Sequence, residues 1–246
     1  MTMALLVLQL LILPVSLAPA VENGDREFSG IRYAAAETFY HAALASGSDS
    51  SEALWRLARL YVCMADVSTG DRKLGLYRQA ESFADRCLMA DSMSSEGHTW
   101  RAAALGNIAM FEGSKMKVKL CHAIKKELDE SIRLNPDDDI AWSILGSFYM
   151  ALGSVSWLER RLAAIFLGSL PDGGYEDAEL ALLKAVDLSP QIIRHHAELG
   201  DLYMRQNRNR EALIEFRQVM SLPVRLANDE RAQSDAARLI QELNQD

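Results

Sequence analysis

The chain has 246 residues and a net charge of −8, with 26 lysines and arginines against 34 aspartates and glutamates. A hydrophobic fraction of 49% is normal for a globular chain and excludes a wholly disordered one. Three cysteines are too few for a disulfide-stapled mini-protein, the single long apolar run excludes a polytopic membrane protein, and the acidic charge disfavours a dedicated nucleic-acid binder.

Residues 1–20 form an uncharged, mostly apolar segment that is broken at Pro14 and ends in Ala18-Pro19-Ala20. This small-x-small ending is typical of a signal peptide, so we expect export to the periplasm or out of the cell, with cleavage after Ala20. No lysine or arginine precedes the apolar run, and the alternative is that residues 1–20 remain as a membrane anchor. The folded domain is then residues 21–246.

Helical patterns follow the leader. Residues 29–45 carry small side chains at helical spacing and predict a lone terminal helix. The next helical pair is outlined by Trp55, Ala58, Ala80, Ala84 and Cys87. The three cysteines, Cys63, Cys87 and Cys121, fall on helical patterns without metal-ligand spacing, so we interpret them as small buried side chains. An oxidising compartment permits one disulfide among them without requiring it.

The prolines outside the leader reveal a period. Pro190 and Pro223 are 33 residues apart, and Pro136 and Pro190 are 54 apart, which is one period plus about 20 residues. A period near 34 is the signature of the tetratricopeptide repeat, a helix–turn–helix unit. One unit carries the repeat's W-x2-L-G-x2-Y and A-x3-F-x2-A-x4-P patterns at Trp142, Leu145, Gly146, Tyr149, Ala178, Leu182, Ala185 and Pro190.

Flanking units follow the same pattern. The preceding one is outlined by Trp100, Ala103, Ala104, Ile124, Leu128, Ser131 and Pro136, and the following one by Leu199, Gly200, Tyr203, Ala212, Phe216, Val219 and Pro223. Residues 228–243 predict an amphipathic helix that closes the array. No stretch shows sustained period-two alternation, so we predict an all-α, tetratricopeptide-like helical-repeat array (an α-α superhelix) with two insertions.

The first insertion (residues 112–119) alternates lysine with other residues, as in a basic surface strip or a solvated linker. The second insertion (residues 156–166) predicts an amphipathic helix with Ser156 as N-cap. Two arginines, Arg160 and Arg161, are too few for a membrane-surface helix, so we expect them to face outward or clamp a loop carboxylate. The apolar face is then expected to cover the array with Trp157, Leu158, Leu162, Ile165 and Phe166.

Catalytic motifs are absent from the sequence, which holds no G-x-S-x-G, Gly-rich phosphate loop or H-E-x-x-H. His195 and His196 are adjacent and point about 100° apart on a helix, so they cannot share a metal ion. Three aspartates, Asp137 to Asp139, precede a helix and are interpreted as its cap. We expect no catalytic residue, no metal and no cofactor.

Binding is the better-supported chemistry. In such arrays the first helix of each unit lines a concave groove. Its outward positions carry a basic bias, which suggests an acidic or C-terminal-carboxylate peptide held by arginine; the alternative is that these arginines are merely solvated. The candidates are Arg56, Arg101, Ser143, Ser147, Met150, Arg194, Asp201 and Arg205, with Cys63, Met64, Ile108 and Met204 in the same register.

A set of motifs carries a resemblance over about residues 53–243. They are His98-x-Trp100, Glu112-Gly113-x-Lys115-x-Lys117, Leu134-Asn135-Pro136-x-Asp138, Trp157-x2-Arg160-Arg161-x-Ala163 and Tyr175-Glu176-x-Ala178. Because it carries these motifs in this order, the chain resembles the regulator of microtubule dynamics protein family. The resemblance implies a tetratricopeptide-like adaptor without catalysis. Animal members are associated with microtubules, mitochondria or membrane contact sites, some through an N-terminal anchor.

We therefore expect a non-enzymatic scaffold or adaptor that binds a protein or peptide partner in its groove. An export signal would make it a bacterial exported relative, separated from tubulin. The alternatives are a membrane-anchored envelope assembly or membrane-contact factor, or a microtubule-associated protein in a eukaryotic host. We expect no nucleic-acid partner, and membrane contact only through an uncleaved N-terminal segment.

Overall fold

The computed structural model describes residues 17–46 and 50–245, which form helices without any strand. The all-α prediction is confirmed. The helices are α1 Leu17–Ser29, α2 Tyr33–Ala45, α3 Ser51–Asp66, α4 Gly70–Ala90, α5 Ser95–Glu112, α6 Ser114–Leu134, α7 Asp139–Gly153, α8 Trp157–Phe166, α9 Tyr175–Leu188, α10 Ile193–Arg205, α11 Asn209–Ser221 and α12 Asp229–Leu243. Residues 1–16 of the expected leader lie outside the described residues, and α1 runs through the expected cleavage position after Ala20.

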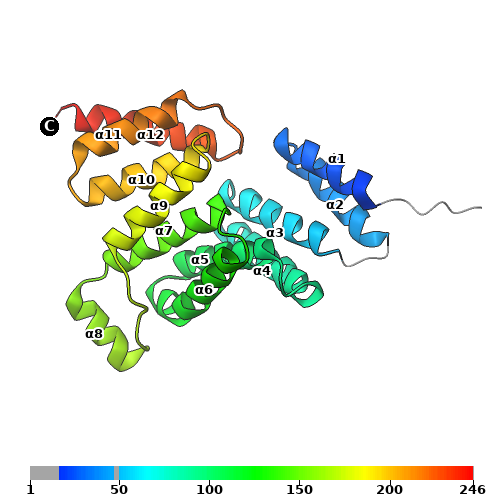
Figure 1. The fold of residues 1–246 in the computed structure, drawn as a ribbon, viewed down its shortest axis with the longest axis horizontal. Helices are drawn as coiled ribbons and strands as arrows, with labels where there is room; N and C mark the ends of the chain where they lie inside the picture. Colours follow the sequence, from blue (N-terminus) through cyan, green and yellow to red (C-terminus); the bar gives the residue numbers. More distant parts are fainter. Residues whose placement is uncertain (1–16, 47–49, 246) are drawn as a thin grey trace, which may run out of the picture.

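The helices stack as consecutive pairs (Figure 1). The pairs are α1 with α2, α3 with α4, α5 with α6, α7 with α9 and α10 with α11, and α12 packs on α11 at the end. The predicted closing helix is thus confirmed as α12. The prediction of a lone helix at the other end is wrong, because α1 pairs with α2, and Val21 packs on Ala43 and Ala53.

Two glycines explain the close approach within the best-matched units. A Cβ atom on Gly146 of α7 would lie 2.5 Å from Leu182 Cγ on α9. One on Gly200 of α10 would lie 2.6 Å from the ring of Phe216 on α11. Real Cβ contacts are not this short, so the glycine of the repeat motif is required by helix–helix packing rather than by backbone conformation.

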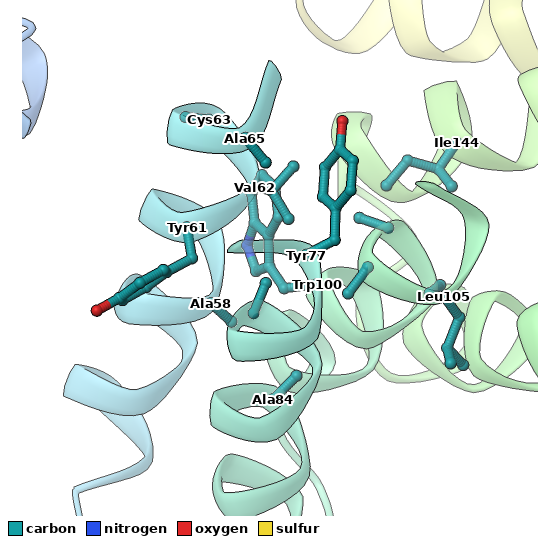
Figure 2. Packing of buried hydrophobic residues seen from close by; sticks show 14 of the residues in the cluster. Ala58, Tyr61, Val62, Cys63, Ala65, Tyr77, Ala84, Trp100, Leu105 and Ile144 are labelled. Atoms are coloured by element: carbon teal, nitrogen blue, oxygen red, sulfur yellow. The ribbon is translucent and has the colours of Figure 1, made fainter. Parts of the chain in front are cut away.

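Two main clusters of buried side chains form the core. The larger runs from α1 to α9, and Figure 2 shows side chains that α3, α4, α5 and α7 contribute to it, among them Ala58, Tyr77, Trp100 and Ile144. The smaller joins α9 to α12 around Leu182 and other buried residues. Each pair of helices buries its apolar face against a neighbouring pair, so the core extends along the stack.

The first insertion is helical and lengthens its unit. Residues 114–119 form the first turns of α6, and Gly113 alone separates this helix from α5. Gly113 has φ 92° and ψ −166°, a conformation open essentially only to glycine. The linker interpretation is therefore wrong.

The second insertion contains the predicted helix, α8. The Ser156 hydroxyl accepts a hydrogen bond from the Glu159 N–H, and the Glu159 carboxylate accepts one from the Ser156 N–H at 2.8 Å. This capping box confirms Ser156 as the N-cap. The prediction that α8 covers the array is wrong, because none of its residues is buried and the helix stands off from the stack in Figure 1.

The loop between α11 and α12 contacts helix α2 near the other end of the array. The Ala227 N–H, in the loop between α11 and α12, donates to the Tyr33 hydroxyl on α2 at 3.2 Å. The neighbouring Leu226 packs on the larger core cluster. Residues 194 positions apart in sequence thus meet, and the C-terminal loop touches the N-terminal helices.

Candidate functional site

The predicted groove arginines of the N-terminal half are engaged within the protein. Arg56 on α3 lies 2.9 Å from a carboxylate oxygen of Asp25 on α1 and 2.6 Å from one of Glu52. Its side chain is only 15% exposed. Arg59, one turn later, also reaches Asp25 and lies over the ring of Phe28. Both arginines therefore fasten α1 to α3.

Arg101 on α5 has the same kind of role. It lies 2.6 Å from Asp85 on α4 and 2.6 Å from Glu127 on α6. Glu127 is buried and also lies 2.5 Å from His98 Nδ1. The hydrogen bond to Glu127 raises the pKa of His98. Burial opposes ionisation of Glu127, but the hydrogen bonds from His98 and Arg101 outweigh it and lower its pKa.

The basic bias predicted for the groove is absent at three of its arginines. Arg56 and Arg101 are neutralised as described, and Arg194 on α10 pairs with Glu198 at 2.8 Å. The alternative, that these arginines are merely solvated, is also wrong, because each holds a carboxylate. Arg205, at the end of α10, is exposed, as is Asp201 one turn earlier.

Several other register positions do not face the solvent. Ser143, Cys63 and Ile108 are buried, so their side chains cannot meet a ligand without rearrangement of the core. Ser147 donates its hydroxyl to the Ser143 carbonyl at 3.1 Å. Three methionines of the same register are half-buried and pack at the edge of the core clusters. They are Met64, Met150 and Met204.

The buried histidines bind carboxylates on neighbouring helices. His195 Nε2 lies 2.7 Å from Asp139 on α7, and His196 Nδ1 lies 2.7 Å from Glu215 on α11. The two rings point to different partners, as predicted from their adjacency. Among residues 17–46 and 50–245, no three histidine, cysteine, aspartate or glutamate side chains gather closely enough to hold a metal ion.

The three cysteines are free and buried, as the small-hydrophobe interpretation predicts. Burial raises the pKa of the Cys63 thiol to about 12 and raises those of Cys87 and Cys121. Raised pKa values and poor access make these thiols unreactive.

The predicted aspartate cap is confirmed. The Asp138 carboxylate accepts a hydrogen bond from the Ala141 N–H at 3.0 Å, at the start of α7. Its other oxygen accepts from Thr99 on α5 at 2.6 Å. The cap therefore also joins two units of the array.

The family-motif residues divide into two groups. Those on α5 are structural, because Trp100 is buried and His98 binds Glu127. Glu112 pairs with Arg78 of α4 at 2.7 Å beside Gly113. Lys115 and Lys117 are instead exposed on α6. The lysine strip is thus a surface feature, carried on a helix.

The motif residues of α8 differ in role. The Arg160 guanidinium donates to the carbonyl oxygens of Leu152 at 2.8 Å, Gly173 at 3.1 Å and Pro171 at 3.4 Å. It therefore clamps loop carbonyl groups instead of the expected carboxylate. Arg161 lies over the ring of Trp157, 5.2 Å from its centroid, and the Trp157 side chain is exposed.

The apolar face of α8 meets the hollow beside α6. A pocket of about 540 Å³ is lined by Lys115, Lys119 and His122 of α6 and by Phe166 and Leu167 at the end of α8.

No single described helix is long and apolar enough to cross a membrane. Helices α7 and α8 reach the required length and composition only when taken together, across a bend of 97°.

The residues that the sequence did not single out are the carboxylates that bind the arginines and histidines. Asp25, Asp85 and Glu127 are 31, 16 and 26 positions away from the arginines they bind. A sequence rich in acids offers many partners at such distances, so no local signal identifies these pairs.

Comparisons with known proteins agree with this architecture. Residues 21–244 match the family described as regulator of microtubule dynamics protein 1-3. The mouse regulator of microtubule dynamics protein 1 is 28% identical over 196 residues, which are 78% of this chain and 64% of that protein. The rat protein 2 is 27% identical over 198 residues, 80% of this chain and 48% of that protein. The chain thus spans about half to two thirds of these relatives.

A solved structure shows the same fold. A thermophilic tetratricopeptide-repeat protein of Thermus thermophilus superposes with a TM-score of 0.68 at 20% identity, over 92% of this chain and 100% of the other. At this identity the likeness concerns the fold alone, which is a helical scaffold of stacked pairs.

Proposed function

Because the chain belongs to the regulator of microtubule dynamics protein family, as its motifs predicted, we propose that it is a non-enzymatic scaffold that binds a protein or peptide segment along its concave face. The support is architectural. In stacked helical pairs, the first helices of successive units form one extended surface. Binding on such a surface needs no catalytic group, only open side chains of suitable chemistry.

The observation that carries this proposal is the difference between the two halves of the array. Arg56 and Arg101 are held by internal carboxylates, whereas α10 leaves Asp201 and Arg205 exposed. The half-buried Met204 lies between them in the register. We therefore assign partner contact to the C-terminal half.

The chemistry of this patch favours a segment that combines a carboxylate with an apolar side chain. Arginine forms strong, charge-assisted hydrogen bonds with carboxylates, and Arg205 is free to reach solvent. Methionine is flexible and polarisable and adapts to varied apolar partners. Such a surface suits an extended acidic peptide better than a rigid globular partner.

The test is affinity purification of the full chain from its native host, with quantification by mass spectrometry. We expect the Arg205→Glu chain to lose the proteins that the unsubstituted chain retains. The matched control is Arg210→Glu, which makes the same charge change at an exposed position of the neighbouring α11. Equal loss in both variants, or in neither, would contradict the assignment.

The buried histidines support the non-enzymatic part of the proposal. His98, His195 and His196 each contact a carboxylate of another helix, which is the arrangement of a structural hydrogen bond. A hydrolytic turnover that is lost on substitution of one of them would overturn this part.

The N-terminal segment is proposed to direct export, with an uncleaved membrane anchor as the alternative. N-terminal sequencing of the mature protein decides between them, because cleavage after Ala20 would leave Val21 as the first residue. A microtubule-associated role in a eukaryotic host is the other alternative, supported by the names of the relatives. Co-sedimentation of the full chain with polymerised tubulin tests it.

A further inference from the structure

Helix α8 presents an exposed apolar face. The exposed fractions are 69% for Trp157, 58% for Leu158, 69% for Ile165 and 74% for Phe166, where core leucines such as Leu128 have 0%. Leu162 and Leu167 are exposed as well. Scattered apolar residues are common on surfaces, but a contiguous group on one helix marks a contact site.

The helix is fixed in this exposed position. Its first turn is closed by the capping box between Ser156 and Glu159. Arg160 then binds three carbonyl oxygens, one at the end of α7 and two in the segment before α9. The guanidinium holds both ends of the insertion together, so the protrusion of α8 is specified by hydrogen bonds.

Cationic side chains adjoin the apolar face. Lys115, Lys119 and His122 line the same pocket as Phe166 and Leu167, so the lysine strip of α6 reaches the end of α8. Arg161 lies on the apolar face itself, over the Trp157 ring. Charges beyond roughly 8 Å are screened at physiological salt, so this local group counts more than the net charge of −8.

We propose that α8 and the start of α6 dock on an anionic phospholipid bilayer. The apolar face of α8 enters the boundary between headgroups and acyl chains, where Trp157 and Phe166 are well suited. Lys115, Lys119 and Arg161 contact the headgroup phosphates. This departs from the expectation that only the N-terminal segment touches a membrane, because α6 supplies the cations that α8 lacks.

A second copy of the chain is a weaker occupant. A helix of ten residues is about 15 Å long. A stable, specific interface buries roughly 1,200 Å² or more, and one short helix from each copy supplies little contact length for it. Self-association would also bring two copies of Arg161 together, whereas a phosphate-rich surface complements that charge.

The experiment is co-sedimentation of the purified full chain with vesicles. We expect binding to vesicles of phosphatidylcholine mixed with phosphatidylglycerol, weaker binding at high salt, and little binding to phosphatidylcholine alone. Trp157→Ser with Ile165→Ser should reduce binding at least tenfold, and Lys115→Glu with Lys119→Glu should reduce it on the anionic vesicles. Because these side chains are exposed, the melting temperature should stay unchanged.

Matched controls distinguish a specific binding site on α8 from nonspecific adsorption of the protein to vesicles. Leu180→Ser with Ile214→Ser removes apolar side chains that are 71% and 55% exposed on α9 and α11, and should leave vesicle binding intact. Absence of binding to anionic vesicles, or binding that survives the α8 substitutions, overturns the proposal. So does a wild-type dimer that dissociates on those substitutions, which would make a second copy the occupant. Partner capture through α10 is a separate readout and should not change.

Discussion

The two insertions of the array have opposite structural outcomes. The first insertion extends α6 by more than a turn, and Met116 on that extension and Leu120 directly after it pack against the larger core cluster. The second insertion forms α8, which has a stronger apolar face and yet buries none of it. The difference shows that amphipathic patterning predicts a helix but not whether another helix stands opposite its apolar face.

The cause lies in how each insertion is joined to the array. Gly113 turns the chain directly from α5 into α6, so the two helices stay side by side along their length. Helix α8 is instead tied through backbone carbonyls by Arg160, at a distance from the stack. Its apolar side chains therefore remain available, whereas those of α6 stabilise the fold.

The largest contrast is expected between one leucine on α6 and one leucine on α8. Leu128→Ala on α6 should lower the free energy of unfolding by about 2–5 kcal/mol, because the side chain is fully buried and its removal leaves a cavity. Leu162→Ala on α8, where the side chain is 46% exposed, should change it by less than about 0.5 kcal/mol. Urea unfolding followed by circular dichroism measures both. Equal losses would mean that α8 packs on the array.

The next effect concerns the ion pair between His98 on α5 and Glu127 on α6. His98→Ala should lower the free energy of unfolding by about 1–3 kcal/mol near pH 5.5, because buried Glu127 loses a donor. The His98 pKa is raised above its ordinary 6.5, so its contribution is full below pH 6.5 and is lost as pH rises through the raised value. The Glu127 pKa is lowered below 4.5, so its contribution is lost as pH falls through that lowered value.

The difference between wild type and His98→Ala is therefore expected to be largest between about pH 4.5 and 6.5 and to shrink on both sides. Urea unfolding at acidic, intermediate and alkaline pH measures it. His41→Ala, at a side chain that is 47% exposed, is the control for removing a histidine and should change the free energy of unfolding by less than about 0.5 kcal/mol. A difference that stays constant over this range would mean that His98 acts by packing alone.

An effect of similar size is expected at Gly113, where the first insertion joins α5. Gly113→Ala should destabilise the protein by about 1–3 kcal/mol, since the positive φ at this position strains any residue with a Cβ atom. Gly106→Ala within α5 is the control, because its Cβ meets open space and helical backbone, and should stabilise by up to about 1 kcal/mol. Thermal unfolding compares the two. A neutral Gly113→Ala would show that the joint relaxes without cost.

The smallest global effect is expected at the joint of the second insertion. Arg160→Met should change the free energy of unfolding by less than about 1 kcal/mol, because α8 contributes no buried side chain. Amide hydrogen exchange over residues 157–173 should nevertheless rise, since three carbonyl groups lose their donor. Arg161→Met, which removes only the contact with Trp157, should leave exchange unchanged. Unaltered exchange in Arg160→Met would show that another contact holds α8.

Much of the fold follows from local spacing. The glycine slots at Gly146 and Gly200, the Asp138 cap and the Ser156 N-cap were predicted correctly, because each depends on residues three or four positions apart or on one helix–helix contact of the repeat. The candidate groove was predicted less well. Arg56 and Arg101 sit at register positions of the repeat, but carboxylates on other helices neutralise them.

The sequence by itself determined that this protein is an all-α array of paired helices and which family it belongs to, because helix period, caps and small-residue slots are local properties. Only the tertiary structure decided which charged side chains form internal ion pairs and which apolar helix face remains exposed to solvent. Both depend on whether a second element comes within contact distance, and that is a matter of backbone path rather than of residue type. The two consequences are that the arginines of the N-terminal half form internal ion pairs and that the apolar face of α8 is exposed to solvent.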